Sequence, residues 1–594
     1  MPTPQQELEA IVRRAATAVL GETTPAGSLV RPCPRPEHGD YQTNVAMVAA
    51  KPARRNPREL AGEIIAELSR AGDPPFAEPE LAGPGFINFR LRPAYVAAQI
   101  AARQGDPRLG VEPAAETRTL VLDFSAPNVA KEMHVGHLRS TILGDSLQRL
   151  FKFLGHRVTS DNHIGDWGTQ FGMVILGWKR EGDEAELARD PFGHLESVYR
   201  RVQAAAEEDE TVREAARAEL KKLQAGDAEN LALWRRFIEL SLQAANGIYG
   251  RLGVHFDTAH GESFYNDALP DVVEELVAAG VARESEGAIA VFSDGSLPPK
   301  DDPLLVAEKK AESGFRPNPF LIRKSDGAFL YATTDLATLQ FRLREYAPGE
   351  IIYVTDGRQQ MHFAQLFETA RQWGVAREVH LVHAWFGTIL GPDKKPFKTR
   401  EGTTIKLKAL LDEAAERARA IVDEKRPDLP EAERAQLAET IGLGALKYAD
   451  LAQNRNLDYV FDWEKLLALK GNTAPYLQNA YVRTRAIFRK AEIDPEAFTT
   501  AEIELAEDAE LTLSKKLLAL GDVLALAAAE CRPHYLCNYL FELADQYHKF
   551  YEACPVLSAP SEGLKLSRLA LCRLTGETLR TGLSLLGIGT AEQM

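Results

Sequence analysis

The sequence has 594 residues, of which 45% are hydrophobic and 26% are charged. This balance is typical of globular domains and excludes whole-chain disorder and fibrous classes. The length predicts roughly two to four domains. The formal net charge of −15 argues against a general binder of polyanions, so any contact with nucleic acid must use local basic patches.

Five cysteines occur, an odd number, and no pair has C-x-x-C spacing. This excludes a thiolate zinc ribbon and argues against a disulfide framework. The first ten residues are polar and lack the apolar segment of a secretory signal. The most apolar stretch, 517–529, is short and is interrupted by Asp522, which favours a buried helix over a membrane span. We therefore expect a cytoplasmic protein with free thiols and no contact with a membrane.

The first segment predicts a small α/β domain over residues 1–112. Helical spacing of apolar residues occurs at 5–20, and further helices are indicated at 45–50 and 58–68. Alternation of apolar and polar residues at 85–91 predicts a strand. Glycine and proline at 105–113 indicate a linker.

Residues 113–430 contain two strand–helix–strand patterns. The predicted elements are 119–124, 136–154 and 158–163 in the first pattern, and 350–355, 361–373 and 379–384 in the second. Each pattern predicts a right-handed crossover between parallel strands. The two halves flank an insertion at about 176–330. This arrangement predicts a doubly wound, Rossmann-like parallel-sheet domain that binds a nucleotide.

Beyond residue 430 the pattern is helical throughout. Long amphipathic runs occur at 431–452, 472–490, 501–529, 535–553 and 565–586. No strand pattern interrupts them. We therefore predict an all-α domain over residues 431–594.

The turn between the first predicted strand and its helix carries His134, Val135, Gly136 and His137. A helix N-terminus offers unpaired N–H groups and partial positive charge, which suits an anion. The two histidines are three residues apart, so they face the same way, and Gly136 permits close approach of a ligand. With Lys131 just upstream, the pattern favours a polyphosphate whose charge builds during phosphoryl or nucleotidyl transfer.

Two other interpretations of these histidines are less favoured. A zinc site would need His156 and His163 to join them, but those two lie beyond a helix and no H-E-x-x-H pattern is present. Simple capping of the helix is disfavoured because serine, threonine and aspartate are better caps than histidine.

A second motif lies at 391–408, which carries six basic and two acidic side chains. Its glycines and prolines predict a loop. On its own this loop is most simply an exposed turn, but beside a phosphate site it would act as a clamp and a lid. The chain lacks a G-x-x-x-x-G-K-S/T loop and a G-x-G-x-x-G after its first strand, which argues against P-loop NTPases and dinucleotide oxidoreductases.

Together these motifs resemble those of class I aminoacyl-tRNA synthetases, and more narrowly the arginyl branch of that class. The His134–His137 turn resembles the class signature at the ATP site, while 125–128, 165–172, 331–335 and 442–450 resemble the arginyl branch. The resemblance covers essentially the whole chain. It implies that arginine and ATP give arginyl-adenylate and pyrophosphate, and that arginine then passes to the terminal ribose of tRNA-Arg.

The resemblance also implies the residues that act on ATP. The expected ATP-binding and catalytic residues are His134, Gly136, His137, Lys131, Lys398, Thr399 and Arg400. Thr399 stands where class I enzymes usually carry the second lysine of a mobile loop. Lys131 is expected to compensate for that missing lysine, and Lys398 and Arg400 are candidates to assist.

Arginine recognition follows from the chemistry of its side chain. A guanidinium is planar with five donors, so it needs fixed carboxylates. Asp335 and Glu262 match the family's positions for this role, with Tyr331 beside them. Asn128 and Gln359 match residues that hold the α-amino and α-carboxylate groups.

The terminal helices resemble the family's anticodon-binding domain, where single-stranded bases would stack on aromatic side chains and meet polar groups. The candidates for tRNA contact are Tyr476, Gln478, Asn479, Arg483 and Met594. The N-terminal domain is expected to contact the outer corner of tRNA.

The resemblance predicts ATP, accompanied by Mg²⁺, together with arginine and tRNA-Arg as substrates. It predicts no protein-bound metal, no DNA partner and a monomer that needs tRNA to activate arginine. The alternatives are a glutamyl-type or cysteinyl-type class I enzyme, a non-catalytic tRNA-binding paralogue, and a zinc hydrolase.

Overall fold

The computed structural model describes residues 1–70, 74–129, 131–168, 170–308, 314–395, 397, 405–498 and 500–594. Its first part is a four-stranded antiparallel sheet in the order β1-β2-β4-β3, with helices packed around it. The elements are α1 (Pro4–Leu20), η1 (Gly21–Thr23), β1 (Val30–Pro32), η2 (Pro36–His38), β2 (Tyr41–Thr43), α2 (Val45–Ala53), α3 (Pro57–Leu68), β3 (Glu80–Ala82), β4 (Phe86–Phe89) and α4 (Pro93–Ala101). Thr3 and Gln6 cap each other's backbone N–H groups, which fixes the start of α1. The predicted α/β character of this segment is confirmed.

A parallel sheet in the order β13-β12-β5-β6 lies at the centre of the molecule. Its elements are β5 (Thr119–Phe124), α5 (Val135–Phe153), β6 (Arg157–Asp161), β12 (Glu350–Val354), α13 (Gln360–Trp373) and β13 (His380–His383). Each half is a strand–helix–strand unit, and the two halves run outward from the adjacent strands β5 and β12. The predicted doubly wound sheet is therefore confirmed. The carboxyl ends of β5 and β12 mark the point where such sheets bind ligands.

The insertion between the two halves contains a helical part and a small sheet part. Its elements are α6 (Gln170–Glu181), α7 (Glu184–Arg189), α8 (Pro191–Glu208), α9 (Glu210–Gln224), α10 (Ala228–Leu252), η3 (Glu262–Ala268), α11 (Leu269–Ala278), β7 (Ala282–Ser285), β8 (Ala288–Val291), β9 (Leu305–Ala307), β10 (Phe315–Pro317), β11 (Phe320–Arg323) and α12 (Tyr331–Tyr346). The antiparallel sheet β11-β8-β7 packs against α11 and α12. Helix α12 returns the chain to the central sheet.

The last part is almost wholly helical. Its elements are β14 (Ile389–Leu390), α14 (Leu407–Lys425), α15 (Glu431–Leu451), β15 (Tyr459–Val460), α16 (Trp463–Leu466), α17 (Ala474–Ala491), α18 (Asp508–Leu518), α19 (Leu520–Ala529), α20 (His534–Ala553) and α21 (Glu562–Leu585). Two sequence predictions were wrong here. The run 501–529 is two helices that meet at Ala519, and β15 is a short strand that pairs in parallel with β14.

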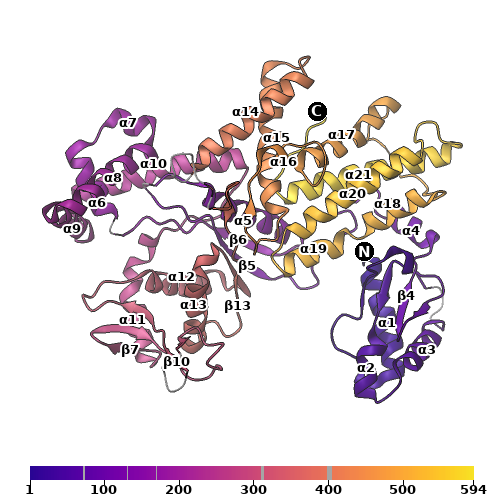
Figure 1. Ribbon diagram of the computed structural model, residues 1–594, viewed down its shortest axis with the longest axis horizontal. Coiled ribbons are helices and arrows are strands. Elements are labelled where there is room, and N and C mark those ends of the chain that lie inside the picture. Colours follow the sequence, from indigo (N-terminus) through magenta and orange to yellow (C-terminus); the bar gives the residue numbers. More distant parts are fainter. Residues whose placement is uncertain are drawn as a thin grey trace.

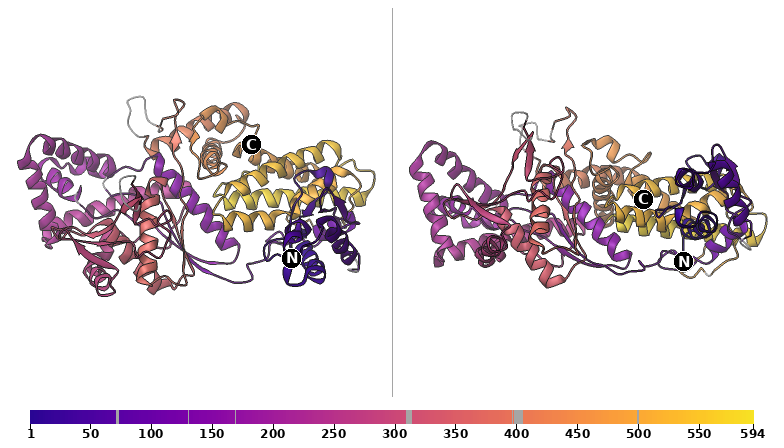
Figure 2. Two further views of the ribbon diagram at one scale, coloured as in Figure 1. Left: turned by 60° about the horizontal axis from the view of Figure 1, so that its bottom comes forward. Right: turned by 90° about the horizontal axis from the view of Figure 1, so that it is seen from below.

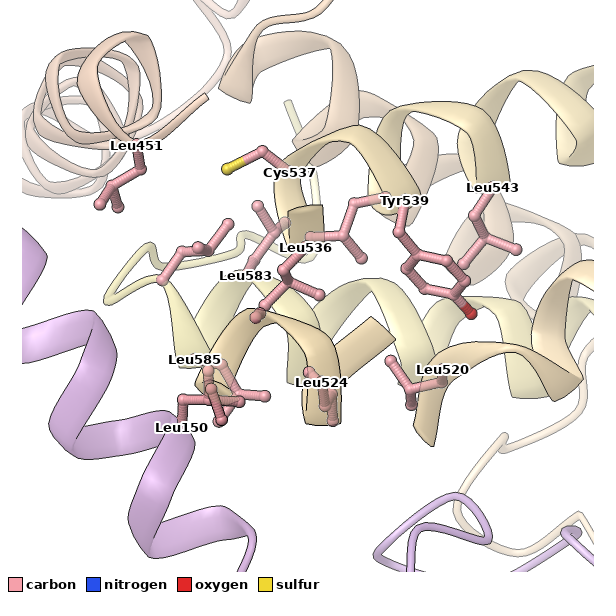
Figure 3. Packing of buried hydrophobic residues seen from close by; sticks show 14 of the residues in the cluster. Leu150, Leu451, Leu520, Leu524, Leu536, Cys537, Tyr539, Leu543, Leu583 and Leu585 are labelled. Atoms are coloured by element: carbon pink, nitrogen blue, oxygen red, sulfur yellow. The ribbon is translucent and has the colours of Figure 1, made fainter. Parts of the chain in front are cut away.

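The helical insertion and the C-terminal helices lie at opposite ends of the long axis, with the parallel sheet between them (Figures 1 and 2). Helix α5 links sheet and bundle, because one hydrophobic cluster contains residues of both. In Figure 3, Leu150 of α5 lies beside Leu585 of α21. The C-terminal half of α5 is thus held by the bundle while its N-terminus faces the sheet crevice.

The N-terminal part packs against the C-terminal bundle. Thr3 donates to Asp522 at 2.6 Å, and Lys515 pairs with Asp40 at 2.8 Å. Among the helices of the described ranges, none has the length and apolar content to cross a bilayer.

Candidate active site

The two histidines of the signature turn cap helix α5 together. His134 is the N-cap residue, and its Nδ1 accepts a hydrogen bond from the N–H of Gly136 at 3.0 Å. The N–H of His134 in turn donates to Nδ1 of His137 at 3.0 Å. The two rings lie 4.0 Å apart between centroids. The histidines therefore do cap α5 and fill the place usually taken by serine or aspartate, whereas the sequence argument had disfavoured capping only as their sole role.

This arrangement fixes the chemical state of both rings. A neutral imidazole that accepts at Nδ1 carries its proton on Nε2. Burial lowers the pKa of His137 to about 3, with a smaller effect from His134. Burial lowers the pKa of His134 as well, and Arg358 adds to that effect. Both side chains are therefore neutral N–H donors, and neither Nε2 atom has a partner among the residues that the structure describes.

Gly136 makes the paired cap possible. A Cβ atom at this position would lie 2.8 Å from Cε1 of His134 and 3.0 Å from its Nδ1. The absence of a side chain at Gly136 leaves room for the imidazole of His134. The sequence argument had instead expected that room to be used by a ligand. The turn before it is strained, because Ser125 and Ala126 have φ of 76° and 48°.

The last residues of the basic loop 391–408 pair directly with the signature turn. His134 and Lys406 form an antiparallel bridge. The N–H of Val135 donates to the carbonyl of Ile405 at 3.0 Å, and the N–H of Leu407 donates to the carbonyl of Met133 at 2.8 Å. The predicted proximity of loop and phosphate site is thus present at the loop's end. Lys398, Thr399 and Arg400 lie outside the described residues.

Lys131 is exposed beside the turn and reaches toward the insertion. Its Nζ lies 5.5 Å from the ring centroid of Tyr199 on α8. Such a contact holds the ammonium weakly and leaves it free to move toward an anion.

The proposed guanidinium ligands gather between α12 and η3. Tyr331 and Asp335 are four residues apart on α12 and share a face. Glu262 begins η3, and burial together with Asp166 and Asp335 raises the pKa of Glu262 to about 8. Partial burial and Glu262 raise the pKa of the Tyr331 hydroxyl. The sequence-predicted residues Glu262, Tyr331 and Asp335 therefore do come together.

Helix α12 is fixed to the sheet by a buried arginine. Arg342 is 0% exposed and donates to Asp123 of β5 and Asp161 of β6, each at 2.7 Å. A buried charge is tolerated only when paired in this way. The pairing sets the position of Tyr331 and Asp335 relative to the turn that follows β5.

Asn128 and Gln359 lie just beyond the carboxyl ends of the neighbouring strands β5 and β12. Phe124 of β5 is in register with Val354 of β12, and Gln359 ends the short helix η4 (Gly357–Gln359) just beyond. Both side chains are exposed, and Asn128 is bridged through its backbone to Gly165. Both residues therefore lie just beyond the carboxyl ends of β5 and β12, and their roles toward the α-amino and α-carboxylate groups stay a prediction.

The candidates for tRNA contact differ in their exposure. Arg483 is exposed, and Tyr476 is half-buried with its hydroxyl 2.9 Å from Nδ1 of His548. Gln478 is 1% exposed and donates to the carbonyl of Gly589 at 2.8 Å, so its amide supports the C-terminal tail. Asn479 and Met594 line one cavity of about 250 Å³.

Comparison with known proteins gives a consistent result for every part of the chain. The family model of the class I (R) tRNA synthetase catalytic domain matches residues 104–463. The arginyl tRNA synthetase N-terminal domain matches 6–91, and the DALR anticodon binding domain matches 477–594. The chain belongs to the arginyl-tRNA synthetases.

Individual relatives of this family agree. The arginine–tRNA ligase of Laribacter hongkongensis is 45% identical over 586 residues, and that of Cellvibrio japonicus is 46% identical over 589 residues, each covering 98% of both chains. Among solved structures, the arginyl-tRNA synthetase of Plasmodium falciparum has a TM-score of 0.83 at 28% identity over 100% of both chains. That of Thermus thermophilus has a TM-score of 0.79 at 25% identity, covering 99% of this chain and 100% of its own. The glutamyl-type, cysteinyl-type and zinc-hydrolase alternatives are thereby set aside.

Three residues at this synthetase's site were missed by sequence reasoning. His362 contacts Asp335, Asp166 lies against Glu262 and accepts from Ser263, and the charge of Arg358 acts on His134. Each lies on a different element from the residue it affects, so no local pattern connects them. The available signals were their positions just after a strand or at the start of a helix and, for Asp166, its place within the motif 165–172.

Proposed function

We propose that the chain activates arginine with ATP to arginyl-adenylate and transfers arginine to the 3′-terminal ribose of tRNA-Arg. The observation that carries this proposal is the reciprocal cap of His134 and His137. It leaves an Nε2–H donor on each of two neutral imidazoles at the N-terminus of α5, the helix that follows β5 of the doubly wound sheet.

In the first step, the α-carboxylate of arginine attacks the α-phosphate of ATP and pyrophosphate leaves. Negative charge grows on the phosphate oxygens during this step. His134 and His137 supply donors that are already fixed in place, and the N-terminus of α5 adds partial positive charge. We assign a supporting role to Lys131 and to the loop residues Lys398, Thr399 and Arg400, which would close over the phosphates.

Selection of arginine relies on the acidic groups of α12 and η3. Asp335 and Glu262 would receive the guanidinium, and Tyr331 would pack against its plane. Burial disfavours the ionised form of Glu262. A cationic side chain stabilises the ionised carboxylate, so it binds there better than a neutral side chain does. Asn128 and Gln359 would hold the α-amino and α-carboxylate groups.

In the second step, a ribose hydroxyl of tRNA attacks the adenylate carbonyl and AMP leaves. We assign tRNA contacts to Tyr476, Arg483, Asn479 and Met594. Gln478 would act indirectly, through the tail that it holds. We retain domain bounds of 1–112, 113–430 and 431–594; the last bound falls in the turn between α14 and α15.

Mg²⁺ is proposed to arrive with ATP. Among the described residues, no group of three or more His, Cys, Asp or Glu side chains is placed to hold a metal ion. The Mg²⁺ ion would be held mainly by the substrate phosphates. We further propose a monomer in the cytoplasm without DNA or membrane partners, which light scattering and fractionation would test.

The test is ATP–pyrophosphate exchange with each amino acid, in the presence and absence of tRNA-Arg. Exchange is expected with arginine only, and only when tRNA is present. Exchange with another amino acid, or binding of tRNA with no exchange at all, would overturn the proposal. The second result would instead indicate the non-catalytic tRNA-binding paralogue.

A further inference from the structure

A hydrogen bond links Asp335 to His362 on the neighbouring helix α13. Nε2 of His362 lies 2.6 Å from Oδ2 of Asp335. We propose that His362 is a positioning residue that aims the Asp335 carboxylate at the guanidinium and thereby sets the selectivity for arginine. This inference rests on the proposed function, because it deepens the role of Asp335 in it.

The direction of the hydrogen bond follows from the chemistry of the two groups. An ionised carboxylate can only accept, so Nε2 of His362 carries the proton that is shared. The separation of 2.6 Å is slightly shorter than is typical of charge-assisted N–H···O hydrogen bonds, so the contact is close. With Oδ2 occupied in this way, Oδ1 remains for the ligand, and rotation of the carboxylate about its Cβ–Cγ bond is restricted.

The imidazole is held by aromatic neighbours. The ring of Phe320, at the start of β11, lies 5.4 Å from it at an interplanar angle of 63°. The ring of Phe363 lies 5.5 Å away at 88°. These edge-to-face contacts fix the ring plane, so His362 can act as a rigid support. The side chains of His362 and Asp335 are 31% and 23% exposed, which keeps the pair partly screened from water.

The bond joins the two ends of the proposed arginine site. Asp335 lies on α12 at the guanidinium end, whereas Gln359 lies three residues before His362 at the α-amino acid end. A contact between α12 and α13 therefore fixes the span between the two ends. A site with a fixed span discriminates arginine from a homologue with one more methylene group, and a site with a loose span does so less well.

Two substitutions separate the hydrogen bond from the packing. His362→Phe keeps an aromatic ring among Phe320 and Phe363 but removes the donor. His362→Gln retains a terminal N–H₂ that can reach Asp335. The matched control is His380→Phe on β13, because His380 also lies near a carboxylate, with Nδ1 3.2 Å from Oε1 of Glu350, but is 72% exposed and has no assigned role in the site.

The experiment is tRNA-dependent pyrophosphate exchange with arginine, homoarginine and ATP varied separately, alongside thermal unfolding. For His362→Phe we expect the KM for arginine to rise about tenfold, because this variant loses one hydrogen bond to a charged group. The KM for ATP should stay within about twofold, and the preference for arginine over homoarginine should shrink. His362→Gln should recover most of the change, and His380→Phe should resemble the wild type.

The outcomes separate this inference from the proposed function. If the wild type shows no exchange with arginine, the proposed function itself fails. If the wild type is active, the inference alone is overturned by an unchanged arginine KM in His362→Phe, by a lower one, or by equal changes for arginine and ATP. If His362→Phe does not fold, His362→Asn replaces it, because the shorter side chain of asparagine places its N–H₂ group too far from Asp335. The inference then requires the same rise in the KM for arginine in His362→Asn.

Discussion

The backbone N–H of His134 donates to Nδ1 of His137 across 3.0 Å, while Nδ1 of His134 accepts from Gly136. These two hydrogen bonds give the N–H groups of His134 and Gly136 an acceptor and also orient both imidazoles. The same side chains therefore stabilise the helix and supply the Nε2 donors, so an alanine substitution would change stability and activity together. Substitutions that mimic one ring nitrogen at a time can separate them.

His137→Asn places an oxygen near the position of Nδ1 and keeps the cap, but it removes the Nε2–H donor. We expect this variant to unfold at the wild-type temperature and to lose about 2–4 kcal/mol of transition-state stabilisation, as when other fixed donors are removed. His137→Ala should lose similar activity and also about 1 kcal/mol of stability with the cap. Pyrophosphate exchange and calorimetry measure the two effects. Wild-type exchange in His137→Asn would contradict the role of the Nε2 donor.

The raised pKa of Glu262 predicts a pH-dependent affinity for arginine. With a pKa of about 8, this carboxyl is mostly protonated in the free enzyme at pH 7 and must release its proton to pair with a guanidinium. The KM for arginine should therefore fall by up to about tenfold per pH unit as pH rises toward 8, and then level off. Steady-state kinetics between pH 6 and about 9 measure this dependence.

Two variants serve as controls for the pH profile. Glu262→Gln should have a high arginine KM that no longer falls with pH. Asp335→Asn should also bind arginine weakly, but its profile should move to lower pH because a charge that raises the pKa of Glu262 is gone. An unchanged midpoint in Asp335→Asn would show that the two carboxyl groups are not coupled.

The parallel sheet and the placement of the signature turn could be predicted because both depend on short-range patterns. Apolar strands alternating with helical segments specify parallel crossovers, and the turn follows β5 directly. Capping by His134 was considered and disfavoured, because this cap requires the ring to bend back onto Gly136, where a Cβ atom would clash. Average capping preferences carry no information on that geometry.

Other errors arose where distant contacts decide the local structure. Every residue from 501 to 507 fits a helix by propensity, yet α18 begins only at Asp508. Buried Glu510 accepts from the N–H groups of Ala506 and Glu507 and pairs with Arg568 of α21, and this network fixes the start of the helix. The contact between His362 and Asp335 likewise joins two helices, so the sequence alone could not reveal it.

The backbone pairing between loop and signature turn can be tested at Leu407. This residue is the first of α14, where proline is tolerated, but proline would remove the N–H that donates to Met133. Leu407 is 0% exposed, so Leu407→Ala is the matched control for lost packing. Both variants should be destabilised by about 2–5 kcal/mol. Only Leu407→Pro should also lower kcat for exchange, by about tenfold, through loss of the loop's anchor.

Side chains of helix α17 bind Glu592 and so hold the C-terminal tail in place. The proposed contact of Met594 with tRNA depends on that placement. Glu592 accepts from Arg485 at 2.8 Å and from Tyr481 at 2.9 Å, and its carbonyl accepts from Arg489 at 3.1 Å. Glu592→Lys would set a cation against two arginines and release the tail that carries Met594. Because these contacts are partly exposed, the effect should be modest, near 1 kcal/mol.

We therefore expect Glu592→Lys to raise the KM for tRNA about fivefold, while the KM for arginine and ATP at saturating tRNA stays unchanged. Aminoacylation at varied tRNA concentration measures this. Glu562→Lys is the matched control, since Glu562 makes a comparable exposed pair with Lys565 at the other end of α21. An equal rise in the control would trace the effect to net charge, and an unchanged tRNA KM in Glu592→Lys would separate the tail from tRNA binding.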